Sequence, residues 1–137
     1  MTADLTISSP HTAAGRDPDR HGRHLHPAAL PQWHALLGLL WRDRLERVTA
    51  LSLAYHDAED AARDVASDRG TRLAAHRQAT GILHLAVTER RALAEIEAAL
   101  NRLAAGRFGW CEQCGGVITA ARLVQTPQAR YCASCDC

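Results

Sequence analysis

Two CxxC pairs near the C-terminus constrain the fold of this 137-residue chain more than any other feature. Cys111 and Cys114 form the first pair, Cys132 and Cys135 form the second, and the seventeen residues 115–131 separate them. Each CxxC turn can present two thiolates to one tetrahedral ion, and the loop between the pairs allows the two turns to face each other. The spacing therefore predicts that these four cysteines hold one structural Zn²⁺ ion.

Four protein ligands complete the coordination of such an ion, so no position remains for a water that the metal could activate. The pattern thus favours a structural metal over a catalytic one. Two other uses of the thiolates stay open, namely iron in a rubredoxin-like electron carrier and a redox-active dithiol. The fifth cysteine, Cys137, is the last residue, and we interpret it as a free thiol.

No constellation of a nucleophile and a base accompanies the cysteines. The histidines of the predicted helical segments have no matching Ser or Cys partner, so we predict that the protein is not an enzyme. These histidines are His34, His56, His76 and His84. Interhelical or solvated positions explain them better.

The formal net charge of +1 argues against a protein that holds nucleic acid through a basic surface. We therefore expect a protein partner and no sequence-specific DNA binding. The longest apolar run, Ala35–Trp41, is far shorter than the roughly 20 residues that a membrane-spanning helix needs. Residues 1–10 do not resemble a secretory signal, so we expect a cytoplasmic monomer without membrane contact. In that compartment, clustered cysteines favour metal binding over disulfides.

Two runs of apolar residues at spacings of three and four predict two long helices, each with one apolar face. Pro31 suits the first turn of the first helix, and Gly106 suits the C-terminus of the second. Only Glu89 interrupts the second run. The apolar positions are Trp33, Leu37, Leu40, Trp41, Leu45, Val48, Leu51 and Tyr55 in the first run, and Ile82, Ala86, Leu93, Ile96, Leu100 and Leu103 in the second.

Two such helices bury their apolar faces against each other, which predicts a mainly α fold built on an antiparallel coiled-coil hairpin. We assign this hairpin to residues 29–105 and a small four-cysteine zinc finger to residues 106–137. The midpoint of the hairpin falls near residue 68, where Gly70 is the natural turn residue. Arms of about 35 residues, rising about 1.5 Å per residue, would carry the turn about 50 Å from the base.

Residues 1–28 mix Pro, Gly, Ser, Thr, Asp and His without apolar periodicity. This composition predicts a disordered N-terminal tail, because it offers too little apolar surface to offset the entropy of ordering. His21, His24 and His26 lie close together in this tail but would give a metal little preorganised geometry. We interpret them as solvated.

Residues 57–70, at the predicted far end of the hairpin, contain five acidic side chains and two arginines, a net charge of −3. A solvated helix end is the simplest interpretation of such charge. Carboxylates at the end of a long projection can, however, also reach a distant cation or a basic surface. We therefore regard this stretch as an acidic tip.

The hairpin, the acidic tip and the four-cysteine finger together resemble the DksA/TraR family of bacterial RNA polymerase-binding transcription regulators. The most specific part is residues 100–135 (LNRLAAGRFGWCEQCGGVITAARLVQTPQARYCASC), with Gly-x-aromatic-Gly before CxxCG, an Arg-Leu pair, a proline and the second CxxC. The resemblance implies a protein that docks at the secondary channel of RNA polymerase and inserts the hairpin. Its tip would then modulate initiation near the active centre, without catalysis.

The tip motif of the family, Asp-x-x-Asp-x-Ala, fits this chain in two places. Asp57, Asp60 and Ala62 match it literally. A turn at that point, however, would make the arms unequal by several helical turns and leave part of the second apolar face without a partner.

The second placement uses Asp64 and Asp68, followed by Arg69. These residues lie at the midpoint of the hairpin, with one extra residue between the two acids. We favour this placement for the tip that approaches the polymerase active centre.

Family members that respond to guanosine tetraphosphate carry basic residues on the hairpin base and around the zinc module. Counting outward from the cysteines, this chain has Glu95, Thr126 and Asp136 at those positions. We therefore predict that it does not bind this nucleotide. The alternative function is a zinc-stapled helical adaptor that uses the same hairpin for a different protein partner.

Overall fold

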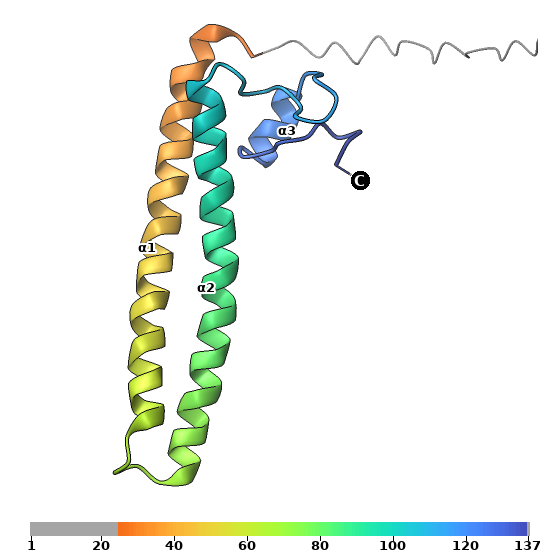
Figure 1. Cartoon of the computed structure of the whole chain (residues 1–137). Coiled ribbons are helices and arrows are strands. Elements are labelled where there is room, and N and C mark those ends of the chain that lie inside the picture. The colour runs from red at the N-terminus through yellow and green to blue at the C-terminus, as the bar shows by residue number, and fades with distance from the viewer. Residues whose placement is uncertain (1–24, 137) are drawn as a thin grey trace, which may run out of the picture.

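The computed structural model describes residues 25–136, which form one long hairpin with a small module beside its base (Figure 1). Helices α1 (Leu30–Arg63) and α2 (Arg69–Ala104) are the antiparallel arms. A short 3-10 helix, η2 (Pro27–Ala29), precedes α1, and α3 (Ala120–Gln125) lies in the module. The predicted mainly α hairpin with a C-terminal cysteine cluster is confirmed.

The described residues contain no β-strand and only one isolated antiparallel bridge, between Trp110 and Val117. None of the described helices has a stretch apolar and long enough to cross a membrane.

The helix ends follow local signals. Pro31 occupies the first turn of α1, where its missing N–H leaves no hydrogen bond unmade. Asp68 caps α2, because its side chain accepts hydrogen bonds from the backbone N–H groups of Gly70 and Thr71. Gly106 follows the last residues of α2 with a left-handed φ of +69°, which is the conformation expected for a glycine at a helix end.

The base of the hairpin and the C-terminal module share one apolar core. Leu37, Ile118 and Leu123 are its largest fully buried side chains. The rings of Trp33, from α1, and Phe108, from the module, lie 5.7 Å apart between centroids. The buried members of this base core are Leu25, Leu37, Ile96, Ala99, Phe108, Cys111, Ile118, Leu123 and Ala129. Apolar packing therefore anchors the module on the arms.

Toward the turn, smaller residues occupy the buried positions between the arms. We call this set the distal seam; it consists of Val48, Ala58, Ala75, Ala79 and Ala86. Alanine removes little apolar area from water, so each alanine of the seam contributes less to stability than a leucine or isoleucine of the base core.

The chain joins the base core before the predicted start of the hairpin at residue 29. Leu25 is only 8% exposed and packs over Gly109, where an added Cβ would lie 3.2 Å from Leu25 Cδ1. His26, the last histidine of the predicted tail, caps η2 with its ring nitrogen. Residues 1–24, with the rest of that tail, lie outside the described residues.

Candidate metal centre and hairpin tip

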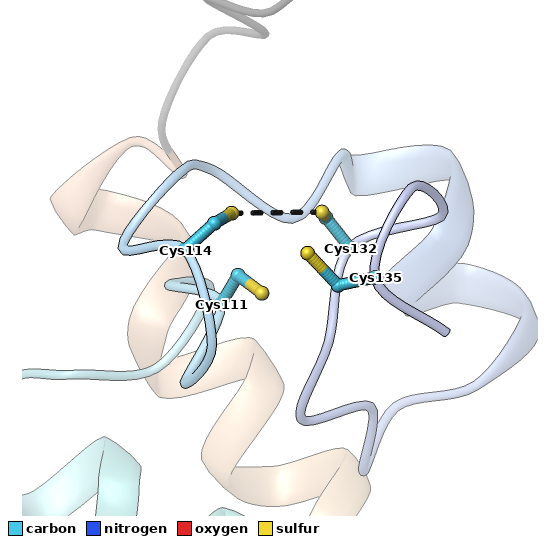
Figure 2. A group of neighbouring side chains, drawn as sticks. All are labelled: Cys111, Cys114, Cys132 and Cys135. Carbon is cyan, nitrogen blue, oxygen red and sulfur yellow. Dashed lines mark hydrogen bonds between the residues drawn. The ribbon is translucent and has the colours of Figure 1, made fainter. Parts of the chain in front are cut away.

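The four cysteines of the two CxxC pairs come together beside the base of the hairpin, as Figure 2 shows. Their sulfur atoms all lie within 4.8 Å of one another, and the Sγ atoms of Cys114 and Cys132 are 3.8 Å apart. A tetrahedral ion with four sulfur ligands at about 2.3 Å requires neighbouring sulfurs to be about 3.8 Å apart. The cluster therefore fits a zinc ion held by Cys111, Cys114, Cys132 and Cys135.

Each cysteine pair lies in a tight turn. In the first, the N–H of Gly115 donates to the carbonyl of Cys111 at 3.0 Å, and Gly115 has a left-handed φ of +68°. This conformation favours glycine, which explains the residue that follows the first CxxC. In the second turn, the N–H of Cys135 donates to the carbonyl of Cys132 at 3.0 Å. The two turns present their sulfurs to a common centre (Figure 2).

The environment of the cluster distributes protons unequally among its sulfurs. Burial alone would raise the pKa of the Cys111 thiol, but backbone hydrogen bonds at Cys114, Cys132 and Gln113 lower it to about 6. Hydrogen bonding to Cys132 and, to a smaller extent, desolvation raise the pKa of Cys135 to about 12. Each of the four cysteines must be a thiolate to ligate zinc, so zinc binding displaces protons from this cluster.

Arg102, on α2, contacts the segments that carry both cysteine turns. This side chain is buried, with the residue only 6% exposed. It donates hydrogen bonds to the carbonyls of Gln128 at 2.9 Å and Ala129 at 3.3 Å, just before the second pair. It also pairs with Glu112, which lies within the first pair, at 3.3 Å. Burial lowers the pKa of Arg102, but a guanidinium remains charged at any physiological pH.

A groove of about 670 Å³ lies on the outside of this junction, between α2 and the second cysteine turn. Glu95, Thr126 and Asp136, which are far apart in the sequence, all line it. Two arginines of the groove are paired with acids: Arg130 contacts Glu95 at 2.6 Å, and Arg122 contacts Asp136. The structure thus brings together the three positions that the sequence count singled out, beside arginines whose charge is already neutralised.

The turn between the arms is built by two aspartates. The Asp64 carboxylate accepts hydrogen bonds from the N–H of Ala66 at 3.0 Å and from the hydroxyl of Ser67 at 2.8 Å. Asp68 uses both of its oxygens to cap the first turn of α2. These bonds favour the ionised forms, so Ser67 lowers the pKa of Asp64 and Thr71 lowers that of Asp68.

The second predicted placement of the tip thus coincides with the turn itself, since Asp64 and Asp68 flank it and Arg69 is the first residue of α2. The prediction that the chain reverses at Gly70 is wrong, because that glycine lies inside the first turn of α2. An added Cβ at position 70 would lie 3.0 Å from Asp68 Oδ1. The small residue there leaves room for the cap.

The literal match to the tip motif lies on the last two turns of α1. Asp57 is exposed, and its side chain makes no ion pair or hydrogen bond with other residues of the described range 25–136. Among the described residues, Asp60 forms an ion pair only with Arg63 of the same helix, at 3.6 Å, and Ala62 is half-buried. Both acid pairs are therefore near the same end of the hairpin, but in different environments.

Comparison with known proteins agrees with this architecture. Residues 106–135 match the family described as "Prokaryotic dksA/traR C4-type zinc finger". The fold matches the structure of transcription factor DksA2 from Pseudomonas aeruginosa with a TM-score of 0.64 and 29% sequence identity, over 80% of this chain and 81% of that one. The fold is similar to that of DksA2, and residues 106–135 are a zinc finger of the DksA/TraR type. The cysteine cluster is accordingly its four-cysteine zinc site, and the prediction of one structural zinc is confirmed.

A curated relative matches only part of the chain. It is an uncharacterised protein from Aquifex aeolicus (strain VF5), 42% identical over 52 residues, which is 38% of this chain and 36% of the relative. The match to DksA2 covers much more of the molecule, including a hairpin of the same kind.

Three features of this structure are missed by reasoning from the sequence alone. Leu25 falls within the predicted tail. The only sign in the sequence that it could be buried is its apolar side chain, five residues before Leu30. Arg102 is one of many arginines, and only the fold reveals that it is buried. Glu89 interrupts the apolar face of its helix, but the sequence does not predict its partner Arg44, 2.6 Å away on α1.

Proposed function

We propose that the protein binds bacterial RNA polymerase at the secondary channel and modulates transcription initiation through the tip of its hairpin. Support comes from its likeness to DksA2, a transcription factor, over 80% of this chain. The observation that carries the proposal is the projection itself. Helix α1 has 34 residues, hence a length of about 50 Å, and it leads to a turn flanked by Asp64 and Asp68.

In this proposal the two ends of the molecule have different tasks. The base, with its shared core and its zinc site, docks on the rim of the channel. The tip delivers negative charge toward the active centre of the polymerase. The protein itself catalyses no reaction, and it acts in the cytoplasm, without contacts to a specific DNA sequence.

We assign the effect on the polymerase to Asp64, Asp68 and Arg69. Their support is position, because they flank or follow the chain reversal at the far end of the arms. Internal hydrogen bonds hold both carboxylates ionised and oriented. A carboxylate has about four lone-pair sites, so each still has capacity to accept a hydrogen bond or to approach a cation.

Asp57 and Asp60 are the alternative. Their carboxylates are less engaged within the chain, but they lie on the last two turns of α1 rather than in the turn between the arms. With Ala62 they remain the second candidate for the contact with the polymerase.

We also propose that guanosine tetraphosphate is not a ligand. A nucleotide with several phosphates needs cationic side chains, whereas Glu95 and Asp136 place negative charge in the groove. The arginines there are already paired, with Arg130 held by Glu95 at 2.6 Å and Arg122 held by Asp136. Equilibrium binding of labelled nucleotide to the polymerase complex tests this, and saturable binding that requires Arg122 or Arg130 would contradict it.

The test of the main proposal combines binding with function. Purified protein is expected to co-elute with core RNA polymerase and to change the lifetime of open promoter complexes. In the double variant Asp64→Asn/Asp68→Asn, binding should persist while the effect on lifetime is lost. Asparagine keeps one side-chain oxygen, which can accept the hydrogen bonds from the backbone N–H groups of Ala66, Gly70 and Thr71, so this variant removes charge with little change of shape.

Asp57→Asn/Asp60→Asn is the matched control, because it removes the same charge two turns away. If this control loses the effect on open-complex lifetime and the first variant keeps it, the residues that act on the polymerase are those of the literal motif, Asp57 and Asp60. If the wild type does not bind polymerase at all, the proposal fails, and an adaptor for another protein becomes the better interpretation.

A further inference from the structure

One charged pair crosses the interface between the arms in the middle of the hairpin. Arg44 Nη1, on α1, lies 2.6 Å from Glu89 Oε2, on α2. The Glu89 side chain is only 13% exposed and that of Arg44 is 33% exposed, so both are partly removed from water. Glu89 is also the residue that interrupts the apolar face of α2. We call Arg44 and Glu89 the register pair.

The register pair lies where the base core gives way to the distal seam. On the base side, Trp41 donates its indole N–H to Glu97 at 3.0 Å, and large apolar side chains follow. On the tip side, the buried positions of α2 are Ala75, Ala79 and Ala86. Alanines on one face of a helix resemble one another in size and shape. A seam of this kind therefore discriminates weakly between one alignment of the arms and another that is displaced by a turn.

A charged pair discriminates strongly. A slip of one helical turn would move the arms by about 5.4 Å relative to each other. The 2.6 Å contact between Arg44 and Glu89 would then be lost, and a largely buried carboxylate would have no cation beside it. Replacing both partners by apolar residues, in contrast, often leaves stability unchanged or raised. Such a pair can specify an alignment without contributing much to stability.

We propose that the Arg44–Glu89 pair fixes the register of the two arms and thereby sets how the tip is presented. The functional part of this inference rests on the proposed function, because presentation matters only if the tip acts on a partner. The structural part does not. Arg44 and Glu89 are positioning residues, since they lie on the shaft of the hairpin and act on the tip through the alignment of α1 and α2.

The test replaces the pair in two ways. Arg44→Leu/Glu89→Leu removes the charges and retains apolar volume, and Arg44→Glu/Glu89→Arg exchanges them. In the Leu/Leu variant we expect an unchanged or higher thermal midpoint, nuclear Overhauser contacts between the arms that fit more than one register, and several-fold faster amide exchange in residues 60–72. The charge-exchanged variant should restore a single set of contacts and the slow exchange.

A matched control is Asp43→Leu/Arg47→Leu, because those residues form an ion pair within α1 with both side chains more than half exposed. This control should keep the wild-type contacts between the arms. If the Leu/Leu variant also keeps one register and slow tip exchange, the inference is overturned. If it fails to fold, the charge-exchanged variant decides, because a disturbed register there would equally overturn the inference.

The polymerase assay separates this inference from the proposed function. The Leu/Leu variant should still co-elute with polymerase but show a reduced effect on open-complex lifetime, which the charge-exchanged variant restores. If wild-type protein does not bind polymerase, the proposed function fails while the register measurements still stand. If binding is normal and the lifetime effect is insensitive to a demonstrated loss of register, the role in tip presentation is refuted.

Discussion

The base and the distal half of the hairpin hold their arms together in different ways. At the base, large apolar residues from α1, α2 and the module form one core around Leu37, and the four cysteines and Arg102 join the module to it. Beyond the register pair, the buried positions between the arms are Val48 and four alanines. Local stability follows buried apolar area. Stability is therefore concentrated where the module attaches, and we propose that alignment of the far end depends on a few specific contacts.

Removal of zinc should produce the largest difference in local stability between the two regions. Structural zinc contributes binding free energies of roughly 10–16 kcal/mol in isolated zinc fingers, so chelation should unfold residues 106–136. The tip half of the arms should lose much less protection. Hydrogen exchange measured by mass spectrometry, before and after chelation and again after zinc is restored, checks this. If the module stays protected after complete removal of zinc, the metal is not what keeps it folded, and this prediction is contradicted.

Truncation of one isoleucine in each region of α2 should lower stability by different amounts. Ile96→Ala empties a position in the base core that is 3% exposed, and such a change costs about 2–5 kcal/mol. Ile82→Ala makes the same deletion at a half-buried position beside the distal seam and should cost clearly less. Urea unfolding of the zinc-loaded protein measures both. Equal losses at the two sites would mean that the distal arms are as well packed as the base.

Arg102→Met should weaken the link between α2 and the cysteine turns. It leaves the carbonyls of Gln128 and Ala129 without their buried donor, at a cost of about 1–3 kcal/mol for each group that water does not reach. Loss of such outer contacts typically lowers metal affinity about 10–100-fold. Competition with a chelator measures the affinity. Arg130→Met is the control, because that side chain is 33% exposed, and it should have the smaller effect.

Asp68→Ala should give the smallest and most local change. Loss of the cap should speed amide exchange in the first turn of α2 and leave the base unaffected. Asp68→Asn should keep most of the protection. The pKa of Asp68 is below its usual 3.8, so the ionised cap is fully present above that pH and is lost as the pH falls through the native value. Acidifying wild-type protein through this native pKa, which lies below 3.8, should therefore reproduce the alanine effect at the tip.

Much of the architecture was predictable because it depends on local or periodic patterns. The repeat of apolar residues predicted two arms, the spacing of the cysteines predicted a tetrahedral metal site, and Gly106 predicted the end of α2. Each of these signals involves residues within a few turns of one another. Both candidate tips could also be named, although the choice between them needed the position of the turn. The expectation that Gly70 forms that turn was wrong, because α2 already begins at Arg69, with Asp68 as its cap.

The zinc site was determined by the sequence alone, since the geometry of CxxC turns and of a tetrahedral ion leaves little choice. The contacts between segments that are distant in the chain, in contrast, follow only from the tertiary structure. Leu25 packs against Gly109, Arg102 against the carbonyl of Gln128, and Arg44 against Glu89. Burial and pairing of this kind depend on which surfaces meet, and a single sequence carries no local signal for that.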